Sequence, residues 1–372
     1  AARTIASRAG TAADAGPVEV TVAPTPLVSV VTPVHNGEAF LAECIESVLA
    51  QSYDRWEYTI VNNCSTDRSL EVAERYAQKD SRVRVISTER LLDVMGSQNT
   101  AFRQVSPNAS YCKMVHADDW LFRNCLREMV ELAEAHPSVG IVGAYRLDGT
   151  KVDLDGLPYP STVVPGKQLS RTMMLGGPRV FGSASALMYR AGYVRQRPAF
   201  FDESDFHADV AACYDILREA DFGFVHQVLT FTRTHPGEQS SYAGRLKTYI
   251  AGRFRHLVKF GPSCMEPAEY QDRVQQALSH YYRFLAKSLV SPGAREVLAY
   301  HRSALAEIGY PFSWRRLLAV VTPYWGYALR HPSEALRLVM RLPGTAEAAP
   351  RVSSVPQPPQ PAAPPRSRNP GA

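Results

Sequence analysis

The sequence predicts an α/β fold: a doubly wound, mostly parallel sheet with helices on both faces, followed by a helical C-terminal region. The first observation is that short apolar, β-branched runs alternate with stretches of helical period up to about residue 244. Alternation with short connections is typical of parallel sheets. The second is that the pattern becomes helical only from about residue 245.

The first strand is predicted at 28–32, where "VSVVT" is apolar and β-branched. A helix is predicted over 38–51, because its apolar residues recur at helical spacing. These residues share one face: Phe40, Leu41, Cys44, Ile45, Val48 and Leu49.

The alternation then continues to residue 115. Strands are predicted at 57–62, 83–87 and 111–115. Between them lie two predicted helices, of which the first is capped by Ser65 or Asp67 and the second spans 94–105.

Composition divides the chain into four parts. Residues 1–26 are rich in Ala, Thr, Gly and Pro and are predicted to be disordered, as is the proline-dense segment 343–372. The α/β domain is predicted over 27–244 and the helical region over 245–342.

Bulk composition excludes several classes of protein. Hydrophobic residues make up 45% of the 372 residues, enough for a sizeable core, and a net charge of +5 is too small to imply nucleic acid. The six cysteines show no CxxC spacing, so we expect reduced thiols and neither a disulfide framework nor a zinc site. The beginning of the chain shows no signal peptide, and no run of about 18 apolar residues occurs. We therefore expect a cytoplasmic location.

Two adjacent acids, Asp118 and Asp119, follow the predicted strand 111–115. The loops 32–37 and 62–67 also follow strands, and ligands bind beyond the carboxyl ends of the strands in such sheets. Carboxylate oxygens at this edge suit a hard divalent ion. The alternative is a plain N-cap pair for a helix beginning near Leu121, with Asp119 as the cap.

The segment "VSVVTPVHNGEAFLAECIESVLAQSYDRWEYTIVNNCSTDRSLEVAERY" resembles the opening of family 2 glycosyltransferases of the GT-A fold, and the resemblance extends over 27–240. It implies inverting transfer of a sugar from a nucleotide-diphospho-sugar, a UDP- or dTDP-sugar, to a hydroxyl group. It also implies a divalent metal, Mg²⁺ or Mn²⁺, and a saccharide or lipid-linked acceptor in envelope or extracellular polysaccharide or glycolipid synthesis.

The resemblance implies the roles of individual residues. Asp118 matches the metal-binding aspartate of the family, and Asp119 and His235 are further expected metal ligands. Arg233 is an expected phosphate clamp in "LTFTRTHPGEQSS", although a His-Pro-Gly run is also an ordinary turn. The expected donor-binding residues are Thr32, Pro33, Val34, Asn36, Asn63, Asp67, Asn99, His116, Ala117, Asp118 and Arg233.

Two positions depart from the family pattern. His116 stands where an aspartate is usual; it is expected to bind a ribose hydroxyl or Mn²⁺, or to be a buried histidine with internal partners. Asn62 and Asn63, followed by Cys64, replace Asp-Asp-Gly. An amide side chain both accepts and donates hydrogen bonds, so the identity of the nucleobase in the nucleotide-sugar stays open.

The expected general base is Asp209 in "FDESDFHADVAACYDIL", where Ala208 replaces the usual glutamate. Asp202 and Asp205 match the motif less well, and an acid at a helix N-terminus also has a purely structural explanation. The glycine-rich loop 175–185 is a weaker candidate for close approach of a sugar or acceptor.

Two other classes of enzyme would need a different loop after a strand. Nucleotidyl transferases and NAD dehydrogenases need glycine-rich loops after a strand, which this chain lacks. A catalytically silent nucleotide-sugar-binding or scaffold protein remains an alternative, since Asn62, Asn63 and His116 replace acids.

Residues 310–341 combine five arginines with a single acid, Glu334, and with interspersed Trp and Tyr residues. Basic and aromatic residues on short helices suit the headgroup layer of an anionic membrane. We expect peripheral contact with the inner face of a membrane, or else packing of these aromatics on the rest of the protein.

Overall fold

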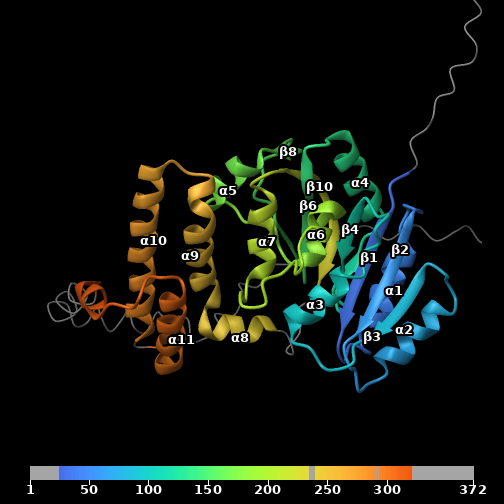
Figure 1. The fold of residues 1–372 in the computed structure, drawn as a ribbon, viewed down its shortest axis with the longest axis horizontal. Helices are drawn as coiled ribbons and strands as arrows, with labels where there is room; N and C mark the ends of the chain where they lie inside the picture. Colours follow the sequence, from blue (N-terminus) through green and yellow to red (C-terminus); the bar gives the residue numbers. More distant parts are fainter. Residues whose placement is uncertain (1–24, 234–238, 290, 292, 321–372) are drawn as a thin grey trace, which may run out of the picture. The chain divides into compact units, whose positions relative to one another are not determined.

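The computed structural model describes residues 25–233, 239–289, 291 and 293–320 (Figure 1). The chain divides into two compact units, Ala1–Trp314 and Arg315–Ala372, and the elements named here belong to the first. Outside the described residues lie nearly all of the predicted disordered segment 1–26, the tail 343–372 and His235, together with residues 321–341 of the predicted membrane-contacting segment.

One half of the central sheet is parallel. It contains, in spatial order, β3 (Val83–Ser87), β2 (Trp56–Asn62), β1 (Val28–Val34) and β4 (Tyr111–Met114). Residue Val28 of β1 pairs with Trp56 on one side and Tyr111 on the other. The carboxyl ends of these strands therefore share one edge, as the alternation of strands and helices predicts.

The other half mixes directions. Strand β9 (Met188–Arg190) lies antiparallel between β4 and β6 (Val139–Asp148), and β6 pairs in parallel with β10 (Asp221–Thr232). Strand β5 (Trp120–Leu121) and the short β8 (Val163–Val164) pair with β10, and β7 (Lys151–Asp153) pairs with β6.

The prediction of a helix beginning near Leu121 is wrong. Residues 120–121 form β5, whose backbone pairs with Thr230 and Phe231, and the Trp120 ring stacks on Phe231 with centroids 4.9 Å apart. Helix α4 (Cys125–Ala135) begins only four residues later. Asp119 is consequently not a helix cap.

Helices cover both faces of the sheet. On one face, the apolar sides of α1 (Leu41–Leu49), α2 (Ser69–Ala77) and α4 form one buried cluster with alternate residues of β1 and β2. On the other face, α3 (Val94–Phe102) packs on β1 and β2, and α6 (Ala191–Arg195) packs on β4 and β9. The predicted fold class is confirmed.

The helical region comprises α8 (Gln239–Leu246), α9 (Thr248–Phe260), α10 (Pro267–Ser288) and α11 (Ala294–Glu307). Helix α9 contacts α7 (Ala208–Ile216), and the 3-10 turn η2 (Gly261–Ser263) contacts α5 (Gly166–Met174). None of the described helices has both the length and the apolar character needed to cross a bilayer. All six cysteines are free.

Candidate active site

The first two strand-end loops are hydrogen-bonded to each other. The Asn63 N–H donates to the Val34 carbonyl (2.7 Å), and the Asn36 side-chain oxygen accepts from the Thr66 N–H (2.8 Å). Asn36 has a positive φ of 52°, a conformation that Asn tolerates better than most residues. The pair of loops therefore forms a defined rim at the carboxyl edge of the sheet.

Asp67 holds the same two loops together. Its carboxylate accepts from the N–H groups of Ser69 and Glu38, each at 3.0 Å. Burial alone would raise the pKa of Asp67, but these hydrogen bonds outweigh it and lower the pKa. Thr32 is also occupied internally, because its buried hydroxyl donates to the Val115 carbonyl (2.7 Å).

Two asparagines expected near the donor are buried and bonded to backbone. The Asn63 side chain exchanges two hydrogen bonds with the Leu92 backbone, both 2.9 Å long. The Asn99 amide likewise exchanges two bonds with the Phe201 backbone, both 2.8 Å. Asn99 thereby fixes the segment that leads into α7, a positioning role that the sequence did not indicate.

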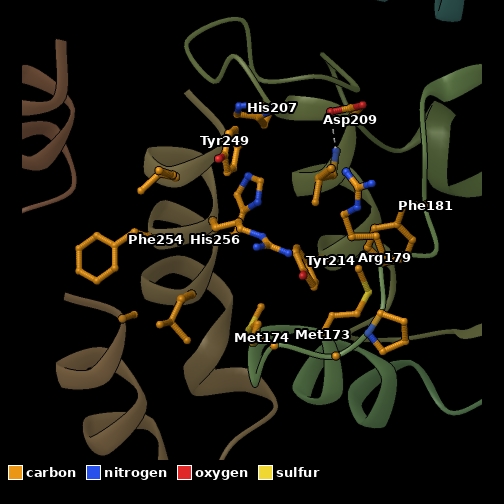
Figure 2. A pocket seen from close by; sticks show the side chains of 18 of the residues that line it. Met173, Met174, Arg179, Phe181, His207, Asp209, Tyr214, Tyr249, Phe254 and His256 are labelled. Atoms are coloured by element: carbon orange, nitrogen blue, oxygen red, sulfur yellow. Dashed lines mark hydrogen bonds between the residues drawn. The ribbon is translucent and has the colours of Figure 1, made fainter. Parts of the chain in front are cut away.

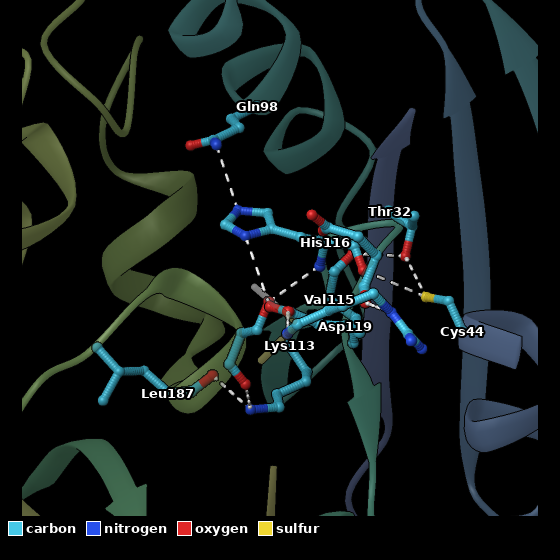
Figure 3. A network of polar contacts seen from close by, with 11 residues as sticks. Thr32, Cys44, Gln98, Lys113, Val115, His116, Asp119 and Leu187 are labelled. Carbon is cyan, nitrogen blue, oxygen red and sulfur yellow. Dashed lines mark hydrogen bonds and ion pairs between the residues drawn. The ribbon is translucent and has the colours of Figure 1, made fainter. Parts of the chain in front are cut away.

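The two acids after β4 lie in different environments, and Figure 3 shows Asp119 within its polar network. Asp118 is partly exposed, whereas Asp119 is 2% exposed. The Asp119 Oδ1 accepts from the Arg233 N–H (3.2 Å). The buried Oδ2 accepts no hydrogen bond from the described residues and lies 3.8 Å from His116 Nδ1. Burial raises the pKa of Asp119, and the nearby His116 and Ser185 only partly offset this.

His116 faces Gln98 and Asp119 and is not a fully enclosed core residue. Its Nε2 lies 3.2 Å from Gln98 Nε2, and 27% of its side chain is exposed. The His116 N–H donates to the Ser185 hydroxyl (2.9 Å). The imidazole is therefore at hand for a ligand that approaches the two acids.

A buried lysine, which the sequence did not single out, supports this loop (Figure 3). Lys113 in β4 is 0% exposed, and its ammonium donates to the carbonyls of Ser185 (2.6 Å) and Leu187 (3.0 Å). Burial lowers its pKa. Lys113 thus holds the 3-10 turn η1 (Ala184–Ala186), which presents Ser185 to the His116 backbone.

Arg233 reaches both acids from β10. Its Nε donates to the Asp118 carbonyl (3.2 Å), its guanidinium pairs with Glu43 of α1, and it lies 4.6 Å from the centre of the Phe40 ring. The structure therefore brings Arg233 next to the two acids, and its role as a phosphate clamp stays a prediction. Pairing with Glu43 was not foreseen.

Asp209 lies in the first turn of α7 and lines a cavity (Figure 2). Its Oδ1 accepts the Val210 N–H (2.9 Å). Burial raises its pKa, and the neighbouring His207 and His256 lower it by less. Burial also lowers the pKa of His207, whose Nε2 lies 3.1 Å from the Thr248 hydroxyl.

The two weaker candidates for the base have internal partners. Asp205 lies 3.2 Å from His256 Nε2, and Asp202 accepts from the Ser204 hydroxyl (2.6 Å). Burial alone would raise the pKa of Asp205, but the His256 contact outweighs it and lowers the pKa. The hydrogen bond from Ser204 lowers the pKa of Asp202. Asp209 alone of the three has a raised pKa, as a general base requires.

The described residues contain no group of three or more His, Cys, Asp or Glu side chains arranged to hold a metal ion. Mg²⁺ is commonly held by only one or two carboxylates together with water and substrate phosphates. The adjacent Asp118 and Asp119, one with a buried oxygen that accepts no hydrogen bond, fit such a site. A divalent ion there would also offset the cost of burying the Asp119 charge.

Known proteins with similar sequences are mostly glycosyltransferases. Residues 29–197 match the family model described as "Glycosyl transferase family 2". The chain is 36% identical over 118 residues to the glycosyltransferase EpsJ of Bacillus subtilis, covering 32% of this chain and 33% of EpsJ. It is 33% identical over 119 residues to the O-antigen biosynthesis protein RfbC of Myxococcus xanthus, covering 32% of this chain and 9% of RfbC. The chain spans about half or less of the first curated relatives that it matches.

The fold has solved counterparts. TarS of S. aureus, in a crystal structure with UDP-GlcNAc, superposes with a TM-score of 0.57 at 18% identity, covering 83% of this chain and 88% of that one. This likeness shows the GT-A fold. The family match covers residues 29–197, and over these residues the chain is similar to glycosyltransferase family 2.

Proposed function

We propose that this chain is a metal-dependent, inverting glycosyltransferase that moves a sugar from a UDP- or dTDP-sugar to a hydroxyl acceptor. The observation that carries the proposal is the pair Asp118–Asp119 at the carboxyl end of β4, where the Asp119 Oδ2 is buried and accepts no hydrogen bond within the part of the chain that the structure describes. Such an oxygen is costly unless a cation or donor satisfies it in the working enzyme.

Each residue then has a distinct task. Asp118 and Asp119 would hold the divalent ion, which would neutralise charge on the diphosphate leaving group. Arg233 already donates to the Asp119 carboxylate and to the Asp118 carbonyl, and its guanidinium would bind the donor phosphates. Asp209 would take the proton from the acceptor hydroxyl, and its raised pKa suits it to that step.

The test is metal-dependent donor binding. Thermal unfolding should be followed with UDP and with dTDP, each with and without Mn²⁺, in the wild type and in Asp118→Asn. At about 100 times the dissociation constant, a bound nucleotide stabilises the native state by about 2.7 kcal/mol. We expect that gain only with Mn²⁺ and only in the wild type.

The matched control is Asp272→Asn, an exposed acid on α10. It should retain the full stabilisation. Stabilisation of Asp118→Asn equal to that of the wild type would remove Asp118 from the metal site. Nucleotide binding without turnover of any donor sugar would favour the catalytically silent alternative.

We further propose that the acceptor belongs to envelope or extracellular polysaccharide or glycolipid synthesis. The relative RfbC, an O-antigen biosynthesis protein, supports this. The basic, aromatic composition of residues 310–341 supports peripheral contact with an anionic membrane at its inner face. Cosedimentation of full-length protein with anionic but not neutral liposomes at low salt is expected, and equal recovery from both would contradict membrane contact.

A further inference from the structure

A cavity of about 530 Å³ opens beside Asp209 (Figure 2). Its walls come from α7, from the glycine-rich loop after α5 and from helices α9 and α10 of the helical region. Within this wall, Tyr214, Tyr249 and Phe254 present aromatic rings, and Tyr249 is 48% exposed. Such rings suit the apolar faces of a sugar, and the two tyrosines combine a flat hydrophobic surface with a polar hydroxyl.

The same cavity has an excess of positive charge. Four arginines line it, against two carboxylates, Asp153 and Asp209. One of these carboxylates, Asp153, forms an ion pair with Arg146 at 2.5 Å. The other three arginines are Arg179, Arg253 and Arg273.

Among the described residues none of these three arginines forms an ion pair, although Arg179 acts on Asp153 at longer range and lowers its pKa. Arg273 donates to the Met174 carbonyl (2.7 Å), and no ion pair includes Arg179 or Arg253. Burial and the neighbouring positive charge of Arg253 lower the pKa of Arg273. Arg179 and Arg253 are exposed, so water screens much of their mutual repulsion, and an anion bound between them would offset the rest.

We propose that this cavity is the acceptor subsite and that it takes an anionic saccharide, one that carries a phosphate or carboxylate group. The proposal rests on the function proposed above and adds the class of acceptor. The arginines would bind the anion and the rings would hold the sugar. In the transfer, the acceptor oxygen bonds to the donor's anomeric carbon, its proton passes to the Asp209 carboxylate, and the nucleoside diphosphate leaves with the electrons of the broken bond.

Binding of small probes tests this directly. Glycerol 3-phosphate, D-glucuronate and neutral methyl glucoside are titrated separately by NMR into full-length protein holding UDP and Mn²⁺. The variants are Arg179→Gln, Arg253→Gln and the double variant, with Arg295→Gln on α11 as control. Arg295 is exposed and lies outside the cavity wall.

At least one anionic probe should bind more tightly than methyl glucoside. Its affinity should fall by about tenfold in each single variant, the usual size for one lost charged hydrogen bond, and should be unchanged in Arg295→Gln. Preference for phosphate or for carboxylate identifies the acceptor group. Equal binding of methyl glucoside, or full anion binding in the double variant, overturns the proposal.

Competition identifies a different error. If UDP displaces the anionic probe, the arginines serve the donor diphosphate and the proposal is overturned. If UDP itself fails to bind, the proposed donor is wrong, while arginine-dependent binding of the anionic probe still supports an anion subsite. If UDP binds and no anionic probe does, only the acceptor class fails.

Discussion

At the scale of single residues, the carboxylates of the site differ in their burial and in the hydrogen-bonding partners around them. Asp119 and Asp209 have pKa values raised by burial, whereas Asp205, paired with His256, has a lowered pKa. A carboxylate with a lowered pKa stabilises the fold in its charged form, and one with a raised pKa destabilises it. The charges of the two raised groups therefore do not stabilise the fold.

Replacing Asp119 should stabilise the metal-free protein while impairing metal-dependent donor binding. The pKa of Asp119 lies above its ordinary 3.8, so the wild type loses stability as pH rises from about that value through the folded pKa. Asp119→Asn lacks this loss. Its free energy of unfolding should therefore exceed that of the wild type by a difference that grows over the same pH window to about 1–3 kcal/mol. Urea unfolding at a series of pH values, with EDTA present, measures it. A variant less stable than the wild type at neutral pH would contradict the account.

Replacing Asp209 should remove the base and spare the donor. Asp209→Asn is nearly isosteric, and we expect turnover to fall by roughly 10²–10⁴-fold with UDP affinity unchanged. In the wild type, turnover should rise with pH through the raised pKa of Asp209, because only the charged form accepts a proton. The variant should lack this acidic limb in its pH–rate profile. A loss below tenfold would transfer the role to Asp205 or Asp202.

At the scale of elements, the central strand β4 and the turn η1 are joined by a buried cation. Lys113 and Ser185 are 72 positions apart in sequence, yet the ammonium of one meets the carbonyl of the other. Ser185 in turn accepts from the backbone of His116, next to the two acids. A charge buried without a carboxylate partner is costly, and here carbonyl oxygens stabilise it.

Lys113→Met should destabilise the protein by about 1–3 kcal/mol, because it leaves the carbonyls of Ser185 and Leu187 buried without a donor. The lowered pKa of Lys113 gives a second signature. In the wild type this group adds stability as pH rises from its folded pKa toward its ordinary 10.5, and the variant should lack that gain. Denaturation at several alkaline pH values measures both.

The control is Lys167→Met, which replaces an exposed lysine of α5. It should change neither stability nor its pH dependence. If Lys113→Met keeps the wild-type slope in the alkaline range, the lysine is not buried as a cation in solution.

At the scale of the whole described unit, the helical region completes the site. Helix α9 packs on α7, and two contacts join α9 to the segment just before Asp209: His256 with Asp205, and Thr248 with His207. The surroundings of Asp209 thus include a helix that follows it by some forty residues. Removal of the helical region would remove the part of the cavity wall that it supplies.

One methyl group at the α7–α9 contact should disturb it. A Cβ added to Gly252 would lie 2.4 Å from His207 Cδ2, too close without a shift. Overpacking costs about 1–3 kcal/mol, and alanine recovers up to about 1 kcal/mol of helix propensity. We expect Gly252→Ala to lower the free energy of unfolding by about 1–2 kcal/mol and to reduce turnover without weakening UDP binding.

Gly244→Ala in α8 is the matched control, because a Cβ there meets nothing within 4 Å. It should raise stability by up to about 1 kcal/mol through helix propensity alone. If both variants are equally stabilised, α9 does not press on His207.

Elements with a local pattern could be predicted from the sequence. Apolar, β-branched runs and the helical spacing of apolar residues located β1, α1, β2, α2, β3, α3 and β4, and parallel order then predicted one ligand-binding edge. The short motifs also placed Asp118, Asp119 and Asp209 at a strand end and a helix start, where the structure has them. Their chemical roles stay predictions.

Only the tertiary structure decided the contacts that join distant segments. The pairing of β5 with β10, the buried ammonium of Lys113 and the reach of Arg233 to Asp119 each join residues dozens of positions apart. The arginines that line the cavity come from four separate stretches of the chain. Spacing along a sequence shows which residues share one strand or helix face, but burial and hydrogen bonding depend on which faces meet after the whole chain has packed.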